Sequence, residues 1–146
     1  MNMFRILLCA MLLAGGCTLH TQAANEHSLA SLSGQVFYRE RMALPPGTTV
    51  TVRLVDVSRA DAKATLLAEQ RIKNPATVPV PFQLEYDPGV IDARMSYAVQ
   101  AQIRDVAGQL LWTTTEHTGV LTRENPVSDI QLLVQRVSGS AAVRGN

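Results

Sequence analysis

Residues 97–104 read YAVQAQIR, and this stretch decides the fold class of the chain. Tyr97, Val99, Ala101 and Ile103 alternate with residues that are polar or small. A period of two is typical of a β-strand that has one face buried and the other in water. The stretch therefore predicts a strand with these four side chains pointing inward.

Other stretches of the chain repeat this alternation. Residues 50–54, 80–86 and 130–134 place an apolar residue at every second position. Weaker alternation predicts further strands at 32–39, with Val36 and Tyr38 inward, at 65–73, at 109–115, with Leu110 and Trp112 inward, and at 118–122. Turn-forming residues separate these runs at 45–47, 74–75, 87–89, 107–108 and 125–126. Seven or eight short strands predict an all-β fold, a small antiparallel β-sandwich of the Ig-like or Greek-key kind.

Two local features allow alternative interpretations. Tyr97 follows an Asp-Pro-Gly turn and Ile91, which fits a tyrosine corner whose hydroxyl bonds to the backbone a few residues upstream. A plain core tyrosine fits equally well. Residues 58–69 resemble a capped helix, with Ser58 and Asp61 as the cap, but their second half also alternates. We favour a loop with one helical turn, followed by a strand.

The chain opens with MNMFRILLCAMLLAGGC, which has the order of a secretory signal. The apolar run at 6–13 is too short to cross a membrane, which takes about 20 helical residues. The small residues at 14–16 precede Cys17 and resemble a bacterial lipobox, in which the thiol receives a diacylglycerol and cleavage makes the cysteine residue one. We predict a lipid anchor on Cys17. Cleavage of an ordinary signal after Ala23 or Ala24, or a buried N-terminal helix, are the alternatives.

These features divide the chain into four segments. We expect a lipoprotein signal peptide at 1–16, a flexible tether at 17–31 that begins with the lipidated Cys17, a β-sandwich domain at 32–137 and a flexible tail at 138–146. Two or three acyl chains hold a protein on a membrane almost irreversibly. Thr18, rather than Asp, follows the cysteine. By resemblance to sorted bacterial lipoproteins, this implies the inner leaflet of the outer membrane, facing the periplasm.

The composition argues against several classes of protein. Arg5 is the only charged residue in 1–16, so the rest of the chain carries 12 of the 13 Lys and Arg residues against 12 Asp and Glu. Such a balanced, scattered charge is not the basic patch of a nucleic-acid-binding protein. Cys9 lies in the signal and Cys17 would carry lipid, so no cysteine remains for a disulfide.

Residue patterns that support catalysis are weak. His20, His27 and His117 share no metal-ligand spacing, and His117 lies in a polar turn. Glu85 and Asp87 share the outer face of one strand, where two acids usually only add solubility. We predict no catalytic residues, no metal, no cofactor, no small-molecule substrate and no enzyme activity. An enzyme would need His117 or the Glu85 and Asp87 pair to lie in a cleft.

The densest cluster of charge is Arg39-Glu40-Arg41, directly after the first predicted strand. It can protect an edge strand, pair with Asp56 or Asp61, or contact a partner. Phe37 is the aromatic residue that the alternation places on the outer face. Phe37, Arg39 and Arg41 are therefore the candidate partner-binding residues.

Residues 33–47, SGQVFYRERMALPPG, resemble the first hairpin of the YbaY-type lipoproteins, a family grouped with the YscW-type pilot proteins of type III secretion. Residues 52–61, 78–87 and 97–103 match as well, so the resemblance covers 32–137. It implies a small β-sandwich on a lipid tether, with no catalytic residues. Pilot proteins hold a segment of an outer-membrane secretin, and an exposed strand edge or an apolar groove suits such a task.

The first hypothesis is therefore an outer-membrane-anchored periplasmic lipoprotein that acts as a non-catalytic binding or assembly module. Its partner would be an envelope or secretion-system protein, and its role would be pilot-like if that partner is a secretin. The alternative is a structural or stress-linked envelope lipoprotein that binds glycan or peptidoglycan. Most aromatic residues alternate inward, which disfavours a surface on which sugars could stack.

Overall fold

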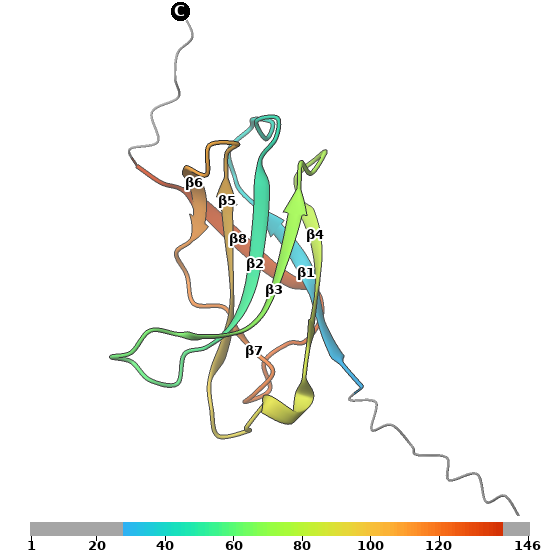
Figure 1. The fold of residues 1–146 in the computed structure, drawn as a ribbon, viewed down its shortest axis with the longest axis vertical. Helices are drawn as coiled ribbons and strands as arrows, with labels where there is room; N and C mark the ends of the chain where they lie inside the picture. Colours follow the sequence, from blue (N-terminus) through green and yellow to red (C-terminus); the bar gives the residue numbers. More distant parts are fainter. Residues whose placement is uncertain (1–27, 139–146) are drawn as a thin grey trace, which may run out of the picture.

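The computed structural model describes residues 28–138, which form an all-β domain (Figure 1). The strands are β1 (Ala30–Phe37), β2 (Thr49–Asp56), β3 (Thr65–Lys73), β4 (Val80–Tyr86), β5 (Tyr97–Arg104), β6 (Leu110–Thr114), β7 (Gly119–Val120) and β8 (Ile130–Arg136), with one 3-10 turn, η1 (Pro88–Val90). The predicted all-β class and strand number are confirmed, although β1 begins and ends two residues earlier than 32–39. The expected signal peptide, Cys17 and most of the tether and tail lie outside the described residues.

The strands form one continuous eight-stranded sheet in the order β3-β2-β5-β6-β8-β1-β4, with β7 paired to the start of β5. The predicted sandwich is not confirmed, because β8 pairs with β1 along its first half and with β6 along its second half. The prediction of a wholly antiparallel arrangement is wrong at one ladder, since β1 and β8 run parallel. Alternation reports which face of a strand is buried and carries no information about its neighbours.

The sheet curls until its two edge strands, β3 and β4, lie beside each other, which makes a nearly closed barrel (Figure 1). No backbone ladder joins these two strands within residues 28–138. A side chain crosses the gap instead, since the Gln83 N–H donates to Oε1 of Gln70 at 2.9 Å. We call this gap between β3 and β4 the seam.

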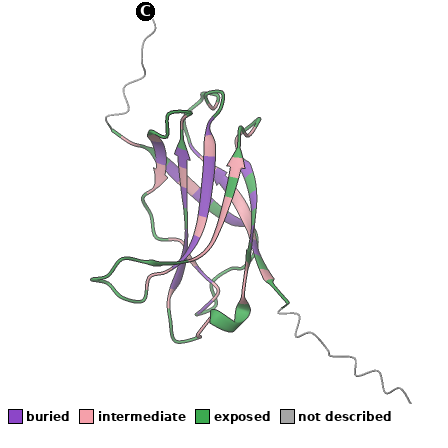
Figure 2. Cartoon of the chain, in the orientation of Figure 1, coloured by how far each residue is buried: buried purple, intermediate pink, exposed green. Residues whose placement is uncertain are grey.

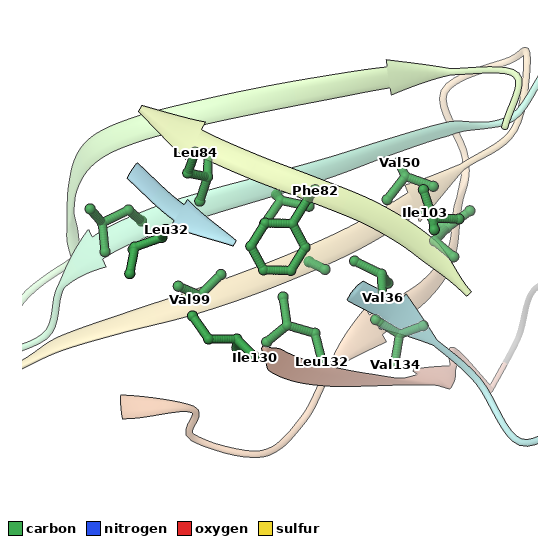
Figure 3. Packing of buried hydrophobic residues seen from close by; sticks show 14 of the residues in the cluster. Leu32, Val36, Val50, Phe82, Leu84, Val99, Ile103, Ile130, Leu132 and Val134 are labelled. Atoms are coloured by element: carbon green, nitrogen blue, oxygen red, sulfur yellow. The ribbon is translucent and has the colours of Figure 1, made fainter. Parts of the chain in front are cut away.

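The inward side chains fill the barrel, as Figure 3 shows around Phe82. The residues that alternation places inward on β2, β4, β5 and β8 are buried, apart from the half-buried Tyr86. One inward assignment is wrong: Leu110 is half-buried and lies opposite the exposed Arg104. A bulge between Ile103 and Arg104 shifts the alternation by one residue, which leaves Trp112 inward.

The connections confirm two further predictions. The Asp92 N–H donates to the Tyr97 hydroxyl at 2.9 Å, so Tyr97 forms a tyrosine corner where the chain passes from β4 to β5. The segment before β3 is a loop with one turn, in which the Ala62 N–H donates to the Arg59 carbonyl. No helix among the described residues is long and apolar enough to cross a membrane.

Candidate partner-binding groove

A groove opens at the point where β1 ends and β8 continues. The β1–β8 ladder stops at Phe37, which lies opposite Leu133, whereas β8 runs on to Arg136. The open space has a volume of about 370 Å³ and is lined by Arg39, Glu40 and residues 133–136. We call it the β8 groove.

Part of the β8 backbone in this groove has a neighbouring strand, β6, on one side only. The Val137 N–H donates to the Leu111 carbonyl on the β6 side. Backbone groups of alternate residues point to opposite edges of a strand, so those of Arg136 point away from β6, toward the β1 side. The last pair of the β1–β8 ladder joins Phe37 of β1 to Leu133 of β8. Beyond that pair, no strand of the described chain lies beside Arg136 on the β1 side. An extended segment could add to this edge and gain backbone hydrogen bonds.

The inner wall of the barrel at this end is an aromatic stack. The rings of Tyr38 and Trp112 lie 5.0 Å apart at an angle of 12°, and the Arg136 guanidinium lies 5.8 Å from the Trp112 ring centre. The Tyr38 hydroxyl donates to the Met42 carbonyl at 2.7 Å, which fixes the start of the segment after β1. Burial, followed by the nearby Glu40 carboxylate, raises the pKa of Tyr38. Stacking and a cation–π contact make this wall rigid.

The three candidate residues from the sequence take different places around the groove. Arg39 is exposed and lines it. Phe37 is half-buried on the outer face of β1, opposite Leu133. The next outward pair along these strands, Gln35 and Gln131, is joined by a 2.7 Å hydrogen bond from Gln35 to Gln131. Arg41 is exposed and is not part of the lining.

Sequence reasoning missed Leu133 and Arg136 as members of the groove. A signal for Leu133 was present, because it is an apolar residue at an outward position of the 130–134 alternation. Arg136 has no such signal, since its role depends on the strand opposite it, Trp112 being its register partner.

The other polar residues considered for chemistry are exposed or cap a turn, and Glu85 also lines the hollow at the seam. His117 and Glu85 are exposed, and Asp87 accepts from the Gly89 N–H at 2.8 Å, which caps η1. The salt bridges within residues 28–138 join Glu69 to Arg53 and Arg71, and Asp92 to Arg94, so none uses Arg39 or Arg41. The described residues contain no group of three or more potential metal ligands.

The seam is a second hollow, with a volume of about 570 Å³ and a lining that includes Leu29, Leu84 and Gln70. The bond from the Gln83 N–H to Gln70 shows that residues 81, 83 and 85 turn their backbone toward β3. Pro81 has no N–H to offer, and the Gln83 N–H is already occupied. On the β4 side of the seam, the Glu85 N–H is therefore the one N–H of these three residues that has no partner within residues 28–138.

Comparison with known proteins gives the family. Residues 27–132 match the model of the YscW family, described as type III secretion system lipoprotein chaperones. The chain belongs to this family. It also resembles the lipoprotein YbaY of Escherichia coli K12, with 29% identity over 104 residues, which cover 70% of this chain and 54% of YbaY. The chain thus spans about half the length of that relative.

A solved structure extends the likeness to the fold. The alternative pilotin of the type II secretion system of Vibrio cholerae matches with a TM-score of 0.67 and 42% identity, over 75% of this chain and 99% of that one. The likeness to YbaY-type and YscW-type proteins expected from the sequence is confirmed. The YscW-family chain is thus similar in sequence to a lipoprotein and in fold to a pilotin.

Proposed function

We propose that this YscW-family protein is a lipid-anchored, non-catalytic pilot that binds an envelope secretion protein, of the secretin kind, from the inner leaflet of the outer membrane. The observation that carries the proposal is the β8 groove in a domain of the pilotin fold. The family is one of chaperones, and a chaperone acts by binding.

The groove suits a segment of a larger partner. Its floor offers backbone groups of Arg136, its rim carries Arg39, Glu40 and Arg136, and Leu133 adds an apolar contact. Main-chain hydrogen bonds supply affinity in strand addition, and the flanking side chains supply specificity. A rigid wall favours binding, because little conformational entropy is lost when the partner docks.

The anchor of this proposal is Cys17, which follows Leu13-Ala14-Gly15-Gly16. A pair of acyl chains would keep the domain at the membrane, where its partner assembles. Ten residues lie between Cys17 and Ser28, and the eleven Cα–Cα steps span at most about 40 Å when fully extended. The domain would then search only a thin layer beside the membrane.

One experiment tests the anchor and the partner together. The full chain, tagged at Asn146, is expressed with an alkyne analogue of palmitate, crosslinked in living cells and purified in mild detergent. We expect the wild-type chain to incorporate the label and to recover an outer-membrane secretion protein. Cys17→Ala should lose the label, leave the outer-membrane fraction and recover much less of that protein.

Two outcomes would contradict the proposal. If Cys17→Ala stays in the outer-membrane fraction, the anchor is not at this residue. If the wild-type chain recovers peptidoglycan fragments and no protein, the glycan-binding alternative is the better account.

A further inference from the structure

The outer face of β3, β2 and β5 carries a cluster of cations. Arg71 lies opposite Thr51, and Thr49 lies between Lys73 and Arg104 in the ladders. The inward neighbours Val50 and Val52 are fully buried, so these residues face out of the barrel. A hollow of about 250 Å³ lies among them, lined by Thr49, Thr51, Arg53, Arg71, Arg104, Asp105, Val106 and Gly108.

The carboxylates near this hollow are already occupied. Both oxygens of Glu69 accept hydrogen bonds at 2.6 Å, one from Nε of Arg53 and the other from Nε of Arg71. These two guanidinium groups hold the pKa of Glu69 below its usual value. Oδ1 of Asp105 accepts from the N–H groups of Ala107 and Gln109, which closes the turn after β5. Three of these four carboxylate oxygens thus already accept hydrogen bonds, and Oδ2 of Asp105 is the exception.

Hydrogen-bond donors remain. The Nη groups of Arg53 and Arg71 make no hydrogen bond within residues 28–138, because both residues bind Glu69 through Nε. Thr51 is only 8% exposed, lines the hollow, and its hydroxyl has no partner among the described residues. Glu69 holds both guanidinium groups in place, so their free edges are oriented in advance. Such a site fits the two oxygens of a carboxylate, which accept from guanidinium forks.

The hollow lies at the end of the barrel away from the tether. β1 starts at Ala30 at one end, and β2 starts at Thr49 at the other (Figure 1). If the proposed anchor at Cys17 holds, the chain before Ala30 leads to the membrane, and the hollow lies at the end of the barrel farther from that attachment. This position favours a protein segment over a lipid headgroup.

We propose that the hollow on β3, β2 and β5 binds an acidic segment of a partner protein, with an Asp or Glu carboxylate held by Arg53, Arg71 and Thr51. The inference extends the proposed function, on which it relies for the existence of a protein partner. It makes this face a second contact, separate from the β8 groove.

Fluorescence anisotropy with the purified full chain in detergent tests this directly. The probes are a fluorescein-labelled peptide of alternating Glu and Ser, and the same peptide with Gln in place of Glu. We expect the Glu peptide to bind about tenfold more tightly than the Gln peptide, and its binding to weaken with added salt. Arg71→Gln and Thr51→Val should each weaken it several-fold, with about fivefold for Arg71→Gln.

Arg94→Gln is the matched control, since it removes the same charge from an exposed arginine that is paired with Asp92 before β5. Thermal unfolding shows whether each variant keeps its fold. Equal losses for Arg71→Gln and Arg94→Gln would overturn the proposal, because binding would then depend only on net charge. Failure of the Glu peptide to bind, or capture by phosphatidylglycerol vesicles without peptide binding, would overturn it as well.

The peptide assay is independent of the cellular test. Peptide binding without a recovered secretion protein would keep the carboxylate-binding site and reject the proposed function. If the wild type and Arg71→Gln both recover a secretion protein but the peptide does not bind, the proposed function is kept and the carboxylate-binding site is rejected.

Discussion

The barrel is interrupted in two places, and the two gaps differ in what they leave free. At the seam, β3 and β4 face each other across a hollow, but Pro81 has no N–H and the Gln83 N–H is bound by Gln70. At the β8 groove, β1 stops and the Arg136 backbone has no strand of the described chain on its β1 side, although β6 lies on the other side. The comparison teaches that a gap in a sheet becomes a site for strand addition only where backbone groups stay unpaired.

The neighbouring strands β2 and β3 also differ, here in how far their side chains are buried. Figure 2 shows β2 mostly buried and β3 mostly half-buried or exposed. Leu66 of β3 is 52% exposed, and Glu69 and Arg71 exchange a salt bridge on its outer face. Charged outward residues on an edge strand oppose unwanted pairing with other chains.

The largest effect is expected from a substitution in β1, the strand that lies between the strand of the β8 groove and the seam strand β4. Gly34 of β1 lies between β8 and β4, and a Cβ there would come within 2.2 Å of the Ile130 carbonyl oxygen and 2.8 Å of the Phe82 ring. Gly34→Ala should therefore lower the free energy of unfolding by about 3 kcal/mol, measured by urea denaturation. Gly108→Ala is the control, because its site is open and only its positive φ of 82° opposes a side chain, at about 1 kcal/mol. Equal losses would contradict the close contact.

The second-largest effect tests whether the partner binds at the β8 groove. Leu133→Asp places a charge on the apolar wall of the β8 groove, so recovery of the crosslinked partner should fall about tenfold. Gln131→Asp, one outward position earlier on the same strand, should leave recovery nearly unchanged. Thermal unfolding verifies that both variants are folded. Unchanged recovery with Leu133→Asp would move the binding site away from the groove.

A smaller effect is expected at the seam. Gln70→Leu removes the acceptor of the Gln83 N–H, and loss of one such bond costs about 1 kcal/mol. Amide hydrogen exchange should become faster at residue 83, while partner recovery stays the same. Gln83→Leu keeps the bond, since the donor is a backbone N–H, and serves as the control. If Gln70→Leu reduces partner recovery as Leu133→Asp does, the seam is part of the binding site.

The smallest effect concerns pH. Hydrogen bonds from Arg53, and then from Arg71, lower the pKa of Glu69 despite the opposing effect of partial burial. A carboxylate whose pKa is lower in the folded state stabilises the fold above the pKa of its unfolded form, about 4.3, and this contribution is lost as the pH falls through the folded value. The loss should be below about 1 kcal/mol, as for other pairs near a surface.

Urea unfolding between about pH 7 and about pH 3, with NMR titration of the Glu69 carboxyl, measures this contribution. Arg71→Gln should move the pKa of Glu69 back toward its ordinary value. The free energy of unfolding should then fall less as the pH is lowered. Arg94→Gln should leave the titration of Glu69 unchanged. A Glu69 pKa that does not move in Arg71→Gln would show that this salt bridge adds little to the outer face.

Local patterns predicted much of this domain because they depend on near neighbours. The alternation in 97–104 placed β5 and its inward side chains, and the Asp-Pro-Gly turn with Ile91 pointed to the tyrosine corner of Tyr97. Alternation failed at Leu110, where a bulge moves one residue to the other face. Arg39 and Glu40 stand out in the sequence by their charge, whereas the place of Arg136 in the β8 groove does not.

Residue patterns along the chain were enough for the all-β class, for the approximate positions of the strands and turns, and for the likeness to YbaY-type and YscW-type lipoproteins. Only the tertiary structure decided that one sheet curls into a barrel, that β1 and β8 run parallel, and that β8 changes neighbours at Leu133. A period of two shows which face of a strand is buried, because it depends on near neighbours in the sequence. Strand pairing instead joins residues that are far apart in the sequence, such as Gln35 and Gln131, which are separated by 96 positions. The β8 groove and the cationic hollow arise from that pairing.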